Sequence, residues 1–141
     1  MAEHPAVVFL EQALDRAEAA ARGLPPGPWR WVEVDDGSER EVLAGADGQA
    51  VLSSGDAESY QSLVWKHAGF EAFLSLMQPT AVLARVAADR QILAEHAKAP
   101  MAACAACADT RHPDPRQWAL VVWPCRTVLL LAAGWGWTEE T

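Results

Sequence analysis

The sequence predicts an α+β protein, with an N-terminal helix on a small antiparallel meander, a second helical region and a zinc-stapled C-terminal unit. Three observations carry this prediction. Apolar residues recur at helical spacing in several segments, short β-rich runs between residues 29 and 53 are separated by turn residues, and a histidine–cysteine set lies near the C-terminus. A chain of 141 residues is expected to form a single domain, 1–141, with residues 96–133 as a zinc-bound subregion.

Residues 4–22 have the pattern of an amphipathic helix. Five apolar residues recur at intervals of three and four, which places them on one helical face: Val7, Leu10, Leu14, Ala17 and Ala21. Pro5 suits the first helical turn, where its missing N–H costs nothing.

A rigid Pro- and Gly-rich connector leads into three predicted strands, over residues 29–34, 41–44 and 50–53. Aromatic and β-branched residues favour extended backbone in these runs. The segments between them, 35–38 and 46–49, contain Asp-Gly pairs, which favour tight turns. The short connections predict an antiparallel meander.

The rest of the chain alternates helical and irregular patterns. Residues 56–77 have helical character, and Pro79 begins a further helix that is expected to end near His96. Residues 100–124 are the least regular part and close with a predicted strand over 118–123. A short helix is expected over 127–133.

Four residues have the chemistry of a zinc site: His96, Cys104, Cys107 and Cys125. A C-x-x-C turn presents two sulfurs to one ion, and Zn²⁺ binds thiolate and imidazole in a tetrahedron. His96 at a helix end and Cys125 at a strand–helix junction can converge on that turn. Four protein ligands close the coordination sphere, so the predicted zinc is structural.

Alternatives remain open at this site. His112, five residues after Cys107, competes with His96 as the fourth ligand. The cysteines could also be free thiols, or the C-x-x-C pair could form a disulfide or redox centre. If only three residues bound the ion, water would fill the fourth position and hydrolytic chemistry would become possible.

Composition excludes other classes of protein. The net charge is −8 and the basic residues are scattered, which disfavours nucleic-acid binding. No signal peptide or membrane-spanning run is recognisable, and an odd number of cysteines fits a cytoplasmic protein better than a secreted one. No nucleotide-binding loop, nucleophile elbow or metalloprotease motif is present.

The C-terminal segment Ala133–Trp137 places Trp135 and Trp137 among glycines. Exposed aromatic residues mark interaction surfaces, so both are candidate protein-binding residues. The alternatives are that both rings fold back over the zinc unit or form a contact between two copies of the chain.

The order of several short motifs carries a resemblance. They are Pro-Gly-Pro-Trp at 26–29, Gly-Ala-Asp-Gly at 45–48, Gln-Pro-Thr-Ala-Val-Leu at 78–83, Ile-Leu-x-x-His at 92–96, the C-x-x-C pair, and Pro-Cys-x-Thr-x-x-x-Leu at 124–131. Over nearly the whole chain it resembles an uncharacterised family of small actinobacterial and actinophage proteins, the domain of unknown function numbered sixty-two twenty-one. Two departures are the Gln78-Pro79-Thr80 start, where the family commonly has Asp-Pro-Ala, and the 133–137 tail, where it has Tyr-Ala-Asp-His-Pro.

This resemblance implies a phage or prophage protein acting in the cytoplasm of a bacterial host, and no established activity. Together with the residues, it favours a non-enzymatic accessory protein that binds a host or phage protein and is stabilised by structural zinc. A small zinc-dependent hydrolase and a nucleic-acid-binding zinc module are the alternatives. No membrane partner is expected, and a homo-oligomer is left open.

Overall fold

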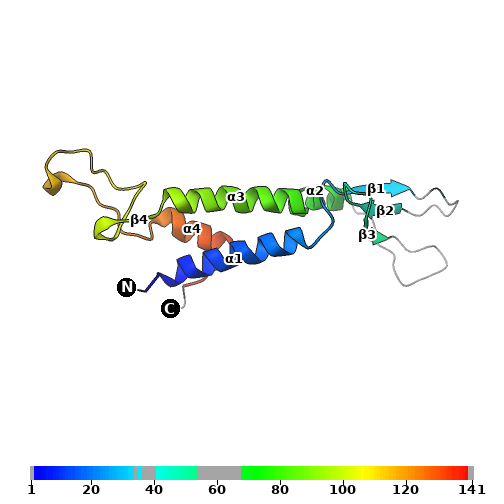
Figure 1. Ribbon diagram of the computed structural model, residues 1–141, viewed down its shortest axis with the longest axis horizontal. Coiled ribbons are helices and arrows are strands. Elements are labelled where there is room, and N and C mark those ends of the chain that lie inside the picture. The colour runs from blue at the N-terminus through cyan, green and yellow to red at the C-terminus, as the bar shows by residue number, and fades with distance from the viewer. Residues whose placement is uncertain (1, 34, 36–40, 54–67, 140–141) are drawn as a thin grey trace. The chain divides into compact units, whose positions relative to one another are not determined.

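The computed structural model describes residues 2–33, 35, 41–53 and 68–139 (Figure 1). Its elements are, in chain order, α1 (Pro5–Arg22), β1 (Arg30–Glu33), β2 (Glu41–Ala44), β3 (Ala50–Ser53), α2 (Ala68–Met77), α3 (Pro79–Glu95), β4 (Lys98–Ala99), the short helical turn η1 (Pro100–Ala102), β5 (Ala103–Cys104), a second such turn η2 (Pro115–Gln117), and α4 (Arg126–Gly134). The α+β class is thus confirmed, with an N-terminal helix, a small antiparallel sheet, further helices and a histidine–cysteine cluster near the C-terminus.

The chain forms two compact units. One comprises residues 1–16 and 86–141, and the other comprises residues 17–85. The helices α1 and α3 each contribute residues to both units. The predicted single domain over residues 1–141 stays a prediction.

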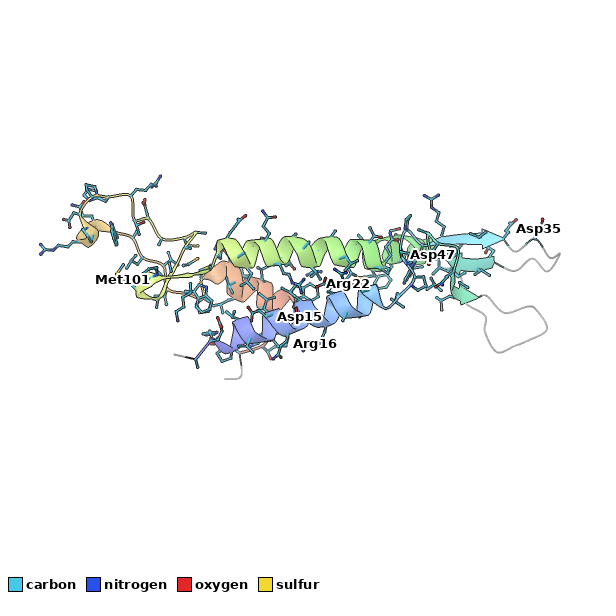
Figure 2. All side chains as sticks on the ribbon, viewed as in Figure 1. Asp15, Arg16, Arg22, Asp35, Asp47 and Met101 are labelled. Atoms are coloured by element: carbon cyan, nitrogen blue, oxygen red, sulfur yellow. The ribbon has the colours of Figure 1, made fainter. Side chains whose placement is uncertain are left out.

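The first unit has a helical core. Its buried helical side chains are Ala6, Val7, Leu10, Ala13 and Leu14 of α1, Val86 of α3, and Val128 and Ala132 of α4. The α1 residues follow the predicted spacing, and each large aliphatic side chain contributes about 1.5–3 kcal/mol when fully buried. At the edge of this core, the Arg90 guanidinium lies 2.7 Å from the Asp15 carboxylate, which Figure 2 labels on α1.

The second unit contains the three-stranded sheet, in the order β1-β2-β3 with antiparallel pairing throughout. Leu43 of β2 is buried, and the register shifts between Leu43 and Ala44. The turn from β2 to β3 is closed by the Gly45 N–H, which donates to the Gln49 carbonyl at 2.9 Å. Gly48 adopts a φ of 80°, a conformation that glycine accepts without strain.

The proline-rich connector is fixed by hydrogen bonds within the second unit. The Trp29 N–H donates to Oε1 of Gln78 at 2.9 Å, and the Trp29 indole donates to the Pro25 carbonyl at 2.8 Å. The Ala46 N–H donates to the Pro26 carbonyl at 2.8 Å. The connector thereby contacts both the start of α3 and the β2–β3 turn.

Most element bounds agree with the sequence prediction, but one predicted strand was wrong. The bounds of β2 and β3 are those predicted, and α1, α3 and α4 agree within a residue or two. The predicted helix over 56–77 is described only from residue 68, and its first part lies outside the described residues. Residues 118–123 form no continuous strand, because only Ala119 and Val122 make isolated antiparallel bridges. No helix in the described part of the chain has the length and apolar character that a membrane span requires.

Gly45 is required by close packing of the connector. A Cβ at this position would lie 2.9 Å from both the Pro25 Cβ and the Pro26 carbonyl oxygen. We therefore expect Gly45→Ala to lower the free energy of unfolding by about 1–3 kcal/mol, because backbone must shift to admit the methyl group. Chemical denaturation measures this. Gly23→Ala is the matched control, since its Cβ would lie at least 3.4 Å from its nearest neighbours, and an equal loss in both variants would contradict the packing argument.

Candidate metal centre

His96 is positioned by the end of α3. It is the residue directly after Glu95, and its N–H still donates to the Ile92 carbonyl at 3.0 Å, so its backbone continues the last helical turn. The indole N–H of Trp123 donates to the His96 carbonyl at 2.9 Å. The histidine is therefore held from both the helix and the segment that precedes α4.

Cys104 and Cys107 lie on a short hairpin and the turn that follows it. Cys104 belongs to β5, which pairs with β4, and its N–H donates to the Val121 carbonyl at 2.7 Å. The turn carrying Cys107 is closed by the Ala108 N–H, which donates to the Cys104 carbonyl at 3.0 Å. The C-x-x-C pair thus presents both sulfurs from one tight turn.

Cys125 is positioned by the start of α4. It is the residue directly before Arg126, and its carbonyl accepts the Leu129 N–H at 3.1 Å, as the first helical hydrogen bond. The side chain is 2% exposed, as buried as a core residue.

The four side chains converge on one point. Nδ1 of His96 lies 3.4 Å from Sγ of Cys104, 3.5 Å from Sγ of Cys107 and 3.3 Å from Sγ of Cys125. All four candidate ligand atoms lie within 4.8 Å of one another. A tetrahedral zinc with bonds of about 2.3 Å to sulfur and about 2.0 Å to nitrogen separates those atoms by about 3.5 Å. The three imidazole–sulfur distances therefore match those of a tetrahedral S₃N site.

The thiols of this cluster differ in acidity. Hydrogen bonding with the Cys104 thiol, burial and the neighbouring Cys125 raise the pKa of Cys107 to about 11. Burial raises the pKa of Cys125, but hydrogen bonds from the Val128 N–H, from the other two thiols and from the Thr127 N–H outweigh it and lower the pKa to about 7. Of these two thiols, Cys125, at the N-terminus of α4, therefore ionises at lower pH.

The alternative fourth ligand, His112, lies outside this cluster. Its side chain is exposed, and its Nδ1 accepts the Asp114 N–H at 3.1 Å. Among the described residues the group that could hold a metal contains His96 instead. The three cysteines form no disulfide.

Sequence reasoning missed the groups that surround the cluster. The lowered pKa of Cys125, and the β4–β5 hairpin that positions Cys104, were not predicted. A signal for the first was available, because a cysteine immediately before a helix occupies the capping position where backbone N–H groups are unpaired. The hairpin gave no such signal, since its strands are two residues each.

The two tail tryptophans lie against their own chain. The Trp135 indole donates to the Asp89 carboxylate at 2.7 Å, and Asp89 is 9% exposed. The Trp137 ring meets the His4 ring edge-on, with centroids 6.3 Å apart. Both indoles are half-buried, and Trp137 also lines a cleft of about 500 Å³ with His4 and Phe9. Their predicted role in protein binding stays a prediction.

Comparisons with known proteins identify a family and no activity. No curated protein and no solved structure matches this chain. The model of one family, described as a family of unknown function (DUF6221), matches residues 3–136. This match spans both units and includes all four residues of the cluster, and the chain therefore belongs to the DUF6221 family.

Proposed function

We propose that this protein is a non-enzymatic zinc protein in which one structural ion is bound by His96, Cys104, Cys107 and Cys125. The carrying observation is the placement of three sulfurs 3.3–3.5 Å from one imidazole nitrogen. Zinc is favoured over other ions because soft thiolates and imidazole in a tetrahedral arrangement suit it, whereas Mg²⁺ and Ca²⁺ take oxygen ligands.

The structural role follows from the number of ligands and from the local lack of a core. Four protein ligands leave no open position for water, which a zinc hydrolase requires. Between Ala97 and Pro124, Ala103 and Cys104 are the only buried apolar residues. A segment with so little hydrophobic support gains its order from ligands that meet at one ion.

The proposed activity is binding of another protein, as an accessory factor of a phage or prophage in the cytoplasm of a bacterial host. Support for protein binding comes from the closed ligand set, from the net charge of −8, which repels nucleic-acid phosphates, and from exposed apolar side chains near the cluster. The phage setting rests on the resemblance described above. Affinity capture from an actinobacterial lysate, with the zinc-free protein as control, tests the activity directly.

Purified protein is expected to contain about one zinc per chain, because four ligands converge on one point. Metal analysis of protein prepared without chelator measures this. Chelation should increase amide hydrogen exchange most between residues 96 and 125, whose order depends on the ligands. Metal-free protein with three freely titrating thiols and unchanged exchange after chelation would refute the proposal.

The ligand set is tested by substitution. Loss of even an outer-shell partner typically weakens metal binding by about 10–100-fold, so Cys104→Ser, Cys107→Ser, Cys125→Ser and His96→Ala should each weaken zinc binding by at least about 100-fold. His112→Ala is the matched control and should bind zinc like the wild type. Competition with a chromogenic chelator gives the affinities. A reversal between the two histidines would make the loop residue the ligand.

The two tail tryptophans are expected to differ in their effect on stability. Trp135→Ala removes a donor to the nearly buried Asp89 carboxylate and should lower the free energy of unfolding by about 2–4 kcal/mol. Trp137→Ala loses a half-buried edge contact with His4 and should cost about half as much. Thermal unfolding and partner capture are measured separately. Loss of capture at an unchanged Tm would identify the tail as the binding surface.

A further inference from the structure

A groove of about 400 Å³ lies beside the cluster. Its lining includes Ala99, Pro100, Met101, Ala103, Trp118 and Leu120. Alanines form much of this lining, and their short side chains leave room for side chains of another molecule. The volume of the groove falls in the range of ligand pockets. It is formed within the first unit, and none of its residues was singled out by the sequence analysis as a binding residue.

The apolar side chains of this region are exposed to an unusual degree. Met101 is 63% exposed, Leu120 is 43% exposed, and Val122 is 73% exposed. Single exposed apolar residues are ordinary, but several on adjoining backbone segments around a groove mark a surface that another molecule covers. Methionine suits such a surface, because its flexible thioether adapts to different partners.

The backbone that presents Met101 is held in an uncommon conformation. Met101 and Ala102 both adopt left-handed backbone, with φ of 61° and 54°, although neither is glycine. The turn is fixed on both sides: the Ala103 N–H donates to the Pro100 carbonyl, and the Trp123 N–H donates to the Ala102 carbonyl at 2.9 Å. Figure 2 labels Met101 at the turn between β4 and β5. Strain of this kind persists where surrounding structure enforces it, and it concentrates at binding sites.

The formal charge of residues 96–133 favours a partner with acidic side chains. Residues 96–133 contain Lys98, Arg111, Arg116 and Arg126 against Asp109 and Asp114, a formal balance of +2, whereas the whole chain carries −8 and the remaining residues therefore carry −10. Zinc bound by three thiolates contributes one negative charge, so the sign of this region is unchanged. Arg111 is already paired with Asp109 at 2.9 Å, but Arg116 and Arg126 are exposed.

We propose that this groove is the docking site for a short segment of a partner protein in which apolar side chains alternate with or adjoin carboxylates. The apolar side chains occupy the groove, and the carboxylates face the exposed guanidinium of Arg116, two residues before the groove residue Trp118. This inference rests on the proposed zinc centre only in that Ala103, on the groove, is adjacent to Cys104. It adds the location of the site and the chemistry of its partner.

The probe is a displayed library of short random peptides, selected on the purified full-length protein. Enriched peptides should combine Leu, Ile or Phe with neighbouring Asp or Glu. Leu120→Asp should weaken their binding at least about tenfold, since it places a charge among apolar contacts. Leu130→Asp is the matched control, because Leu130 is 60% exposed on α4 and does not line the groove, and it should bind like the wild type.

A second pair of variants tests electrostatic complementarity between the protein and the peptides. Arg116→Glu should weaken binding several-fold and reduce its dependence on salt, whereas Arg16→Glu, on exposed α1 surface, should not. Zinc content and Tm are measured for every variant. Should Leu120→Asp fail to fold, Met101→Asp replaces it, since aspartate tolerates left-handed backbone.

Four outcomes would overturn the proposal. The selected peptides could lack acidic residues, or could bind wild-type and Leu120→Asp protein equally. A single-stranded DNA oligonucleotide could displace them, which would make the partner a nucleic acid. Sedimentation could show a dimer that Leu120→Asp dissociates, which would make the occupant a second copy of the chain. Absence of zinc with intact peptide binding would instead refute the zinc centre and leave the docking site standing.

Discussion

The convergence of three thiols and one imidazole is the constraint on which the C-terminal part of this protein depends. Ordering backbone costs about 1–2 kcal/mol per residue. Between Ala97 and Pro124 the buried apolar side chains are those of Ala103 and Cys104, which cannot offset such a cost over a segment of this length. The cluster places two points of the segment, Cys104 and Cys107, and the residue that follows it, Cys125, against His96 at the end of α3. A metal ion at that point would replace a hydrophobic core as the source of order.

The same cluster also forms one of two contacts that join α3 and α4. His96 follows α3 and meets Cys125, which precedes α4. Asp89, earlier in α3, accepts the indole N–H of Trp135, which follows α4. The part of α3 from Asp89 onward and α4 are therefore antiparallel, as Figure 1 shows, and are joined beyond each end of α4. Val128 and Ala132, which lie between these two contacts along α4, are fully buried.

The sequence predicted the features that depend on short-range spacing. Helical periodicity located α1, α3 and α4, and the C-x-x-C pair with His96 and Cys125 identified the cluster. The predicted strand over 118–123 failed for a physical reason. Its residues favour extended backbone, but a strand also needs a continuous partner and a buried face, and this run has only two isolated bridges. The contact between Asp89 and Trp135 joins residues 46 apart and leaves no local pattern to read.

The cluster and the groove share one short stretch of backbone. Ala103 lines the groove and Cys104, the next residue, belongs to the cluster, so a single planar peptide unit joins the two. The left-handed pair at Met101 and Ala102 is held by the hairpin and by the Trp123 backbone, and the Trp123 indole in turn donates to the His96 carbonyl. The strained turn is therefore linked to the cluster through the backbone and through Trp123, while its own hydrogen bonds come from the protein and not from an ion. The proposed metal centre and the proposed docking surface thus rest on one local arrangement.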